Sequence, residues 1–401
     1  MPCLVSPSGK FVVLDDPKEI ARWISEGFRE ANPIEQADYV KKKSMIAQQS
    51  NQKIEDNAKG IYLATVSQGG KDGYGIASAL MLENLRELDV DISTANTGQK
   101  IALLFHNPYS ILRLEAPYRI LYTMFESTKI PDDWRPYLDA ADKIIVPSKW
   151  CQKVFLEAGV KTEVVPLGYN EKVFTYKPRT NRQKNRENFT FVHYNAFNLR
   201  KGFLEVFKAF CKEFSKDEPV RMIFKTTLEH IPLPITKSEY PNIEIIRGKT
   251  SEKELADILY RSDCFVFPSR GEGFGLTPLE AMATGIPAIV PNAHGITEYF
   301  DPEYMYEVKV KEMCPAIYSR YKNQDVGKMY VSDVDDLAKK MRYIYEHQDE
   351  AIEKGKLAAE YVKNWTSRKN AERLKAIFDK TESLDLKNKP LKNRLILELV
   401  K

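Results

Sequence analysis

The most informative segment of this 401-residue chain is Gly271-Glu272-Gly273-Phe274-Gly275-Leu276-Thr277-Pro278-Leu279-Glu280. An apolar, strand-like run (residues 264–267) precedes it, and a helix-like run begins at its last residue. A glycine-rich turn between a strand and a helix lets backbone N–H groups approach an anion, and the helix dipole favours negative charge there. We therefore expect the turn to bind a phosphate group. The residues predicted to contact it are Gly273, Phe274, Gly275, Leu276 and Thr277.

Two carboxylates flank this turn, Glu272 and Glu280, eight positions apart. A carboxylate repels phosphate but accepts hydrogen bonds from hydroxyl groups. Phosphate at the amides and hydroxyls at the carboxylates together describe a sugar nucleotide. A structural alternative exists for both acids: Thr277 as N-cap would make Glu280 the capping-box residue of the helix, and Glu272 would be a solvated loop acid.

The segment resembles the E-x7-E signature of retaining glycosyltransferases with the GT-B fold, of the glycosyltransferase family 4 type. The similarity continues through Gly285-Ile286-Pro287-Ala288 and Gly295-Ile296-Thr297-Glu298, and it extends from about residue 61 to residue 365. It implies an α/β protein with two Rossmann-like domains facing a cleft. It also implies a nucleoside-diphosphate sugar as donor substrate, with no separate cofactor.

Length and composition agree with two domains in a reducing compartment. A chain of 401 residues is too long for one ordinary core. The net charge of +4, from 60 basic and 56 acidic residues, lacks the strong basic bias of a dedicated nucleic-acid binder. The five cysteines form no Cys-x-x-Cys pair, which predicts neither a disulfide framework nor a zinc site. We expect a cytoplasmic protein without a signal peptide or a membrane-spanning segment.

Short apolar runs alternate with longer amphipathic runs, as in parallel α/β sheets. The predicted strands are residues 61–66, 101–105, 119–122, 143–146 and 163–166 in the first half, and 189–194, 220–225, 243–246, 264–267 and 287–290 in the second. We expect an acceptor domain over residues 60–170 and a donor domain over 171–365. Helices in 366–401 are expected to pack back on the first domain.

Three segments fall outside these domains or between them. In the extension formed by residues 1–59, Ile20, Trp23, Ile24 and Phe28 have helical spacing, which suggests a helix that packs on the first domain or binds a partner. The basic and apolar segment 388–401 is expected to dock on the first domain, or else to contact a membrane surface peripherally. The basic run 179–186 is interpreted as a solvated loop, with a phosphate-tracking patch as the alternative.

The resemblance also assigns roles to residues outside the glycine turn. Lys201, in Asn198-Leu199-Arg200-Lys201-Gly202, matches a lysine that binds the donor diphosphate. The family usually has an arginine five residues earlier, where this chain has Ala196, so Arg200 is the candidate for the second positive charge. We expect positive charge here because a leaving diphosphate must be neutralised.

The first half supplies further candidates. Gly69 and Gly70 lie in a glycine-rich turn after the first strand, where the family faces the diphosphate and the acceptor. His106 follows a buried strand at the place of a family histidine that contacts the donor sugar, with an ordinary loop histidine as the alternative. Glu126 is expected on the acceptor side, and Ser148 is interpreted as a structural helix cap.

We expect no bound metal, because the acidic pairs of this chain are adjacent residues and none of the predicted strands ends in an Asp-x-Asp motif. The predicted activity is retaining, metal-independent transfer of a hexose to a saccharide, a lipid-linked glycan or a small hydroxyl compound. Catalytic roles fall to Glu272, Lys201 and His106. Two alternatives stay open: a DNA glucosyltransferase acting on hydroxymethylated bases, and a sugar-nucleotide-binding protein without turnover. The sequence leaves the oligomeric state open.

Overall fold

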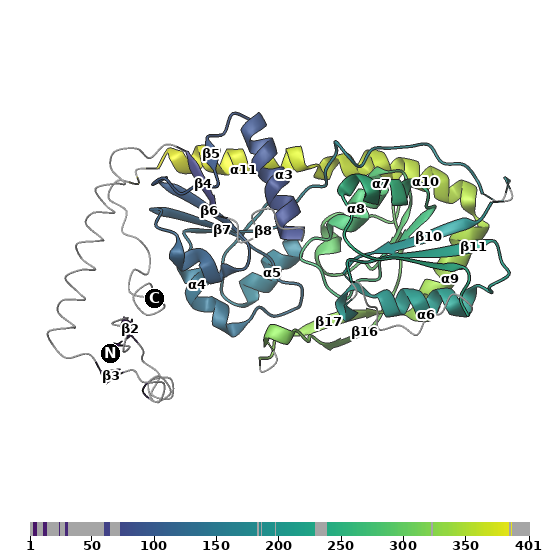
Figure 1. The fold of residues 1–401 in the computed structure, drawn as a ribbon, viewed down its shortest axis with the longest axis horizontal. Coiled ribbons are helices and arrows are strands. Elements are labelled where there is room, and N and C mark those ends of the chain that lie inside the picture. The colour runs from purple at the N-terminus through teal and green to yellow at the C-terminus, as the bar shows by residue number, and fades with distance from the viewer. Residues whose placement is uncertain are drawn as a thin grey trace.

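The computed structural model describes residues 3–5, 11–13, 24, 29–30, 60–64, 73–182, 184–185, 187–196, 198–228, 239–321, 324–384 and 386. Within these residues two α/β domains lie side by side (Figure 1). A small antiparallel sheet near the N-terminus has the strand order β2-β1-β3. Its strands are β1 (Cys3–Val5), β2 (Phe11–Val13) and β3 (Arg29–Glu30).

The first domain is built on a six-stranded parallel sheet with the order β5-β4-β6-β7-β8-β9. The strands are β4 (Ile61–Ala64), β5 (Ile92–Ser93), β6 (Ile101–Phe105), β7 (Tyr118–Tyr122), β8 (Lys143–Val146) and β9 (Glu163–Val164). The helices are α3 (Gly73–Glu87), α4 (Arg135–Asp139) and α5 (Lys149–Glu157), with 3-10 turns η1 (Pro108–Arg113) and η2 (Asp132–Trp134). All residues of β6 and β7 are buried, which explains why these strands are continuous apolar runs.

The second domain has the sheet order β12-β11-β10-β13-β14-β15, also parallel. Its strands are β10 (Phe189–Tyr194), β11 (Val220–Lys225), β12 (Ile243–Ile246), β13 (Cys264–Val266), β14 (Ala288–Val290) and β15 (Tyr306–Glu307). The helices are α6 (Phe203–Glu213), α7 (Glu252–Tyr260), α8 (Leu276–Ala283), α9 (Val334–Glu346) and α10 (Gln348–Tyr361), with 3-10 turns η3 (Leu199–Lys201), η4 (His294–Glu298) and η6 (Val362–Trp365). The strand order reverses between β10 and β13. Ligands of open parallel sheets bind at such a switch point, outside the carboxyl ends of the strands.

The predicted fold class is confirmed: two Rossmann-like domains with parallel sheets. Five predicted strands coincide with β6, β8, β10, β11 and β12. The strands predicted over 119–122, 163–166, 264–267 and 287–290 differ from β7, β9, β13 and β14 by one or two residues at an end. Residues 65–66 of the strand predicted over 61–66 lie outside the described residues. The two-residue edge strands β5 and β15 were not predicted from the sequence. Neither was a hairpin formed by β16 (Val310–Pro315) and β17 (Lys328–Ser332). The residues of β16 are almost all exposed and give no alternating apolar signal.

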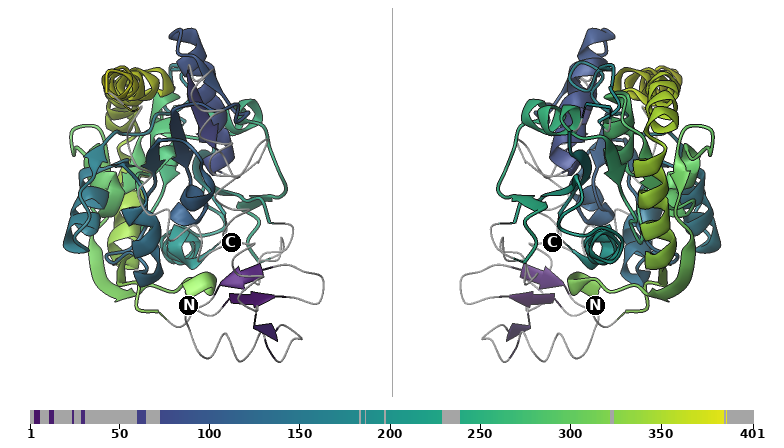
Figure 2. Two further views of the ribbon diagram at one scale, coloured as in Figure 1. Left: turned by 90° about the vertical axis from the view of Figure 1, so that its left-hand side faces the viewer. Right: turned by 90° about the vertical axis from the view of Figure 1, so that its right-hand side faces the viewer.

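The C-terminal helix α11 (Ser367–Glu382) returns from the second domain and packs against α3 of the first, as Figure 1 and Figure 2 show. Asn84 Nδ2 donates to Ser367 Oγ at 3.1 Å, and Arg368 pairs with Glu87 at 3.6 Å. The backbone N–H of Tyr169 donates to Trp365 O at 3.0 Å beside these contacts. The chain therefore crosses between the domains at two neighbouring places.

A third crossing comes from the loop between β16 and β17. We call residues 316–327 the arm; residues 322–323 of it lie outside the described part of the chain. In Figure 1 the hairpin extends along the lower side of the molecule toward α4 and α5. Ser127 Oγ of the first domain donates to Val326 O at 2.6 Å, and the Lys328 N–H donates to Thr128 Oγ1 at 2.8 Å. The arm thus ties the second domain to the loop after β7.

Several predicted features fall where the structure describes little. Gly69 and Gly70, the residues Ile20, Trp23 and Phe28, and the segment 388–401 lie outside the described residues. Ile24 is described and is exposed. Among the helices that the structure does describe, none is long and apolar enough to cross a membrane.

Candidate functional site

The glycine turn after β13 leads directly into α8, whose N-cap is Gly275. Gly275 has φ 90°, a conformation that glycine adopts readily and other residues avoid. No side chain caps this helix start. The first backbone N–H groups of a helix have no partner within it, so they are available to an anion. The Thr277 Oγ1 atom, in the same turn, is buried without a hydrogen-bond partner.

The capping alternative for Glu280 is wrong. Because α8 begins at Leu276 behind Gly275, Thr277 is not the N-cap and Glu280 is not the capping-box residue. The Glu280 carboxylate instead accepts a hydrogen bond from the Tyr194 hydroxyl, at the end of β10. Burial raises the pKa of Glu280 to about 8. A carboxyl group held in this way is unusual for a helix residue with only a structural role.

Glu272 is held by three donors. Its Oε1 atom accepts from Lys201 Nζ at 2.6 Å, from Ser269 Oγ at 2.7 Å and from Arg200 at 3.1 Å. Burial alone would raise the pKa of Glu272, but the charges of Lys201 and Arg200 outweigh it and lower the pKa to about 2. Glu272 is therefore an ionised, buried carboxylate and not a solvated loop acid.

Lys201 and Arg200 both reach Glu272 although they are adjacent in sequence. They lie in the 3-10 turn η3, where the Asn198 side chain accepts a hydrogen bond from the Lys201 N–H at 3.2 Å. Gly202 ends the turn with φ 76°. Burial lowers the pKa of Lys201, and the carboxylate of Glu272 opposes this shift. Two positive charges thus stand beside the glycine turn, as the sequence suggested.

Arg200 also connects the two domains. Its Nη2 atom lies 3.7 Å from Glu126 Oε1 of the first domain, while its Nη1 atom donates to Gly271 O at 2.5 Å and contacts Glu272. A Cβ atom added at Gly271 would lie 2.0 Å from the Glu126 carbonyl oxygen. The glycine turn is therefore packed directly against the loop that carries Glu126.

His106 follows the carboxyl end of β6, and its ring lies against Tyr74 with centroids 4.9 Å apart. Its backbone N–H donates to Tyr122 O at 3.2 Å. The Nδ1 atom is buried and has no hydrogen-bond partner. A buried polar atom without a partner is uncommon in folded proteins, which makes His106 a candidate ligand contact.

Ser148 is the N-cap of α5 and accepts from the Cys151 N–H at 3.1 Å, as expected for a structural residue. It also donates from Oγ to Gly273 O at 2.7 Å, which links the first domain to the glycine turn. Glu298 has a comparable role, because its carboxylate accepts from the Lys149 N–H at 2.7 Å. These contacts fix the turn relative to the first domain.

Two partners of the glutamates were missed by the sequence analysis. Ser269 stands three residues before Glu272 in an unremarkable loop and gave no signal of its own. Tyr194 is the last residue of a correctly predicted strand. Its place at the carboxyl end of a parallel strand could have identified it as a candidate site residue, since ligands bind outside the carboxyl ends of such strands. Among the described residues, no group of three or more His, Cys, Asp or Glu could hold a metal ion.

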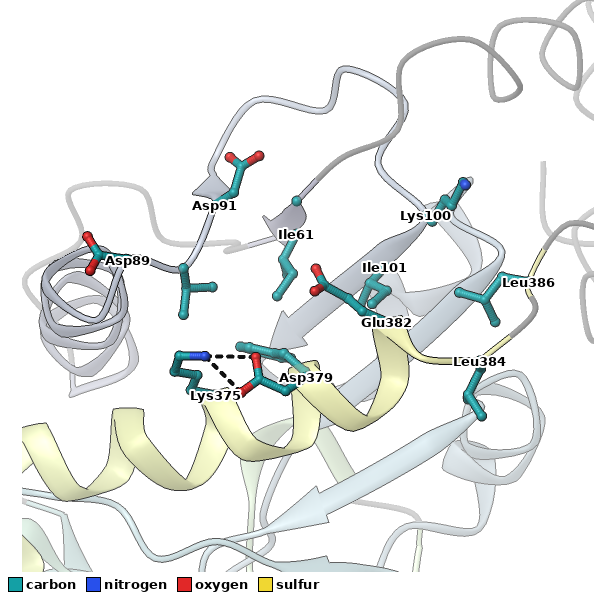
Figure 3. Close-up of a pocket in the computed structure, with 13 residues that line it drawn as sticks. Ile61, Asp89, Asp91, Lys100, Ile101, Lys375, Asp379, Glu382, Leu384 and Leu386 are labelled. Carbon is teal, nitrogen blue, oxygen red and sulfur yellow. Dashed lines mark hydrogen bonds and ion pairs between the residues drawn. The ribbon is translucent and has the colours of Figure 1, made fainter.

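A cavity of about 530 Å³ lies elsewhere on the first domain (Figure 3). Its wall includes Ile61 and Ile101, which begin β4 and β6, and Lys375 and Asp379 of α11. His106 follows the opposite, carboxyl end of β6. The cavity therefore lies at the amino ends of these strands, whereas Glu272 and its partners lie near the carboxyl ends.

Comparison with known proteins finds a family model that resembles the second domain. Residues 177–365 match the family described as Glycosyl transferases group 1. This range contains η3, the glycine turn and both glutamates. ORF313 of Acidianus filamentous virus 1 (isolate United States/Yellowstone), which carries a provisional glycosyltransferase name, is 31% identical over 169 residues. The match covers 40% of this chain and 48% of ORF313, so the chain spans about half the length of this curated relative.

Solved structures resemble the whole two-domain body. A glycosyltransferase from Rickettsia africae ESF-5 superposes with a TM-score of 0.60 at 15% identity, covering 82% of this chain and 100% of that one. HepE of Anabaena, solved with UDP-glucose, gives a TM-score of 0.57 at 12% identity, covering 80% of this chain and 100% of HepE. At such identities the likeness establishes the fold, which is GT-B.

Proposed function

We propose that this chain is a retaining glycosyltransferase of the family 4 type, which transfers a hexose from a nucleoside-diphosphate sugar to a hydroxyl acceptor. The observation that carries the proposal is the convergence of Lys201 and Arg200 on Glu272 at the glycine turn before α8. The match of residues 177–365 to Glycosyl transferases group 1 supports it. The UDP-glucose bound by HepE, a protein of the same fold, supports the choice of donor class.

In this proposal the donor lies across the glycine turn. Lys201 and the N–H groups at the start of α8 neutralise the diphosphate as it departs. Glu280 accepts from ribose hydroxyls, and Glu272 accepts from sugar hydroxyls beside the reacting carbon. Lys201 Nζ donates a hydrogen bond to Glu272 Oε1 at 2.6 Å. The diphosphate would therefore share an ammonium group that is already ordered, which reduces the entropic cost of placing it.

Retention requires attack and departure on the same face of the sugar. The acceptor oxygen forms the new bond to the anomeric carbon as the bond to the diphosphate oxygen breaks. The acceptor proton passes to the departing phosphate oxygen, so no side chain needs to become a covalent intermediate. Protein cations and the helix dipole take the place of a metal ion in neutralising the leaving group.

A saccharide, lipid-linked glycan or small hydroxyl compound is the proposed acceptor, in preference to DNA. The cations of the run 179–186 that the structure describes are engaged within the protein. Arg179 donates to Ser262 O at 2.7 Å, Arg182 pairs with Asp263 at 3.1 Å, and Lys184 pairs with Asp349 at 2.9 Å. Binding phosphates would require breaking these contacts, which disfavours a DNA-tracking role for the run.

A thermal-shift screen followed by a transfer assay tests the proposal. In the presence of a chelator, nucleoside diphosphates and their sugars should raise the melting temperature, since a ligand that binds only the native state stabilises it. Radiolabelled sugar should then pass to members of a glycan acceptor panel. Binding without turnover would indicate the non-catalytic alternative. Transfer to hydroxymethylated duplex DNA, lost on replacing the run's cations, would show that the DNA alternative is right. If no nucleoside diphosphate stabilises the chain, the proposal fails.

A further inference from the structure

The arm is the part of the second domain that reaches the first domain beside Glu126. Besides the bond from Ser127 to Val326, it places Tyr321 against two aromatic residues of the first domain, Tyr109 and Trp134. The Tyr321 hydroxyl is within 3.2 Å of Tyr109 Oη and accepts from Trp134 Nε1 at 3.2 Å. These bonds hold the arm in one position relative to the acceptor side.

Tyr318 lies on the same arm, and its ring packs on Phe125 with centroids 5.2 Å apart. Phe125 directly precedes Glu126. Burial raises the pKa of Tyr318, the charge of Glu126 raises it further, and the charge of Arg200 lowers it. The Tyr318 ring thus contacts the residue directly before Glu126, whose Oε1 atom lies 3.7 Å from Arg200 Nη2.

The two tyrosines of the arm, Tyr318 and Tyr321, differ in the hydrogen bonding of their hydroxyl groups. The Tyr321 hydroxyl is hydrogen-bonded. The Tyr318 hydroxyl oxygen is buried and has no partner at hydrogen-bond geometry. The nearby Ser127 hydroxyl, which lowers the pKa of Tyr318, donates instead to Val326 O at 2.6 Å. A buried hydroxyl without a hydrogen-bond partner destabilises the fold, so its retention calls for a function. A second buried polar atom without a partner is Nδ1 of His106, whose ring lies against Tyr74 in the first domain.

We propose that Tyr318 is an acceptor-binding residue, whose hydroxyl hydrogen-bonds a saccharide hydroxyl group beside Glu126. This inference rests on the proposed function and names one class among its acceptors. A sugar hydroxyl can donate to the Glu126 carboxylate and accept from the Tyr318 phenol at the same time. An apolar acceptor would leave the Tyr318 hydroxyl without a partner and is disfavoured. The arm of the donor domain thereby completes the acceptor side of the site.

The test replaces Tyr318 with phenylalanine, which removes the hydroxyl and keeps the ring on Phe125. The probes are uridine diphosphate for the donor side and methyl glycosides of glucose, mannose and galactose as acceptors. For the glycoside that the wild-type chain uses best, Tyr318→Phe should raise KM about tenfold, the loss expected of one hydrogen bond. Its affinity for uridine diphosphate should stay at the wild-type value. Its melting temperature should not fall, because the hydroxyl that it loses has no partner at hydrogen-bond geometry.

Tyr321→Phe is the matched control, since it removes a hydroxyl of the same arm that is already bonded to Tyr109 and Trp134. It should lower the melting temperature and leave the glycoside KM unchanged. An unchanged KM in Tyr318→Phe, or a loss of stability equal to that of Tyr321→Phe, overturns the inference while donor binding keeps the proposed function intact. A wild-type chain that transfers sugar to water but to none of the glycosides also overturns it. If neither uridine diphosphate nor any other nucleoside diphosphate binds the wild-type chain, the proposed function itself fails.

Discussion

Glu280→Gln should make the protein more stable and its nucleotide binding weaker. The carboxyl group is partly buried and its pKa is raised to about 8 by that burial. Below pH 4.5 the group is protonated in both the folded and the unfolded chain and has no effect. As the pH rises toward 8 the unfolded chain ionises first, so stability falls. Glutamine keeps an acceptor for the Tyr194 hydroxyl but does not ionise, so the variant lacks this loss.

The size of the effect follows from the two pKa values. A rise from 4.5 to about 8 corresponds to an upper limit of about 5 kcal/mol above pH 8. The side chain is partly open to solvent, which screens its charge, so we expect about 1–2 kcal/mol. For a domain of this size that equals a rise in melting temperature of roughly 2–8 °C at pH 8, with almost no change at pH 4.5.

Melting temperatures of both proteins between pH 4.5 and 9, with calorimetry of uridine diphosphate binding at pH 8, measure these effects. The ribose role predicts that binding weakens about tenfold, the cost of one hydrogen bond to a charged group. The variant should therefore gain stability and lose affinity together, as happens where a strained group is kept for function. A difference in melting temperature that does not grow with pH would refute the electrostatic reasoning. Unchanged nucleotide affinity would refute the ribose role.

Three further substitutions test neighbouring contacts. Glu272→Gln should lower kcat at least 100-fold while uridine diphosphate affinity stays within about threefold, because its proposed partner is the sugar; steady-state kinetics with calorimetry decide this. Lys201→Ala leaves Glu272 with fewer donors and should cost about 3 kcal/mol of stability, with nucleotide affinity falling about 100-fold in chelator; an unaffected affinity contradicts the diphosphate role. Gly271→Ala places a Cβ 2.0 Å from the Glu126 carbonyl oxygen and should lower the melting temperature by several degrees; a wild-type value would show that the domains separate readily.

Much of the fold was predictable because its signals are local. A buried parallel strand must be a continuous apolar run, and its helices must be amphipathic, so β6, β8, β10, β11 and β12 could be predicted to the residue. Edge strands of two residues carry no such signal. The hairpin that supports the arm is stabilised by its own pairing and by contacts with the first domain, and its exposed residues show no periodicity.

Local sequence patterns were enough to predict the two-sheet architecture, the glycine turn before α8 and the candidate residues Glu272, Glu280 and Lys201. The partners of these residues became known from the packing of the folded chain. Tyr194 lies 86 positions from Glu280, and Arg200 lies between acids of two domains. The residue preferences of turns and the apolar periodicity of strands involve only a few neighbouring residues, so the local sequence predicts them. Which buried charge meets which donor, and which hydroxyl of the arm is left without a partner, depends on how separate elements pack, and no local pattern encodes that.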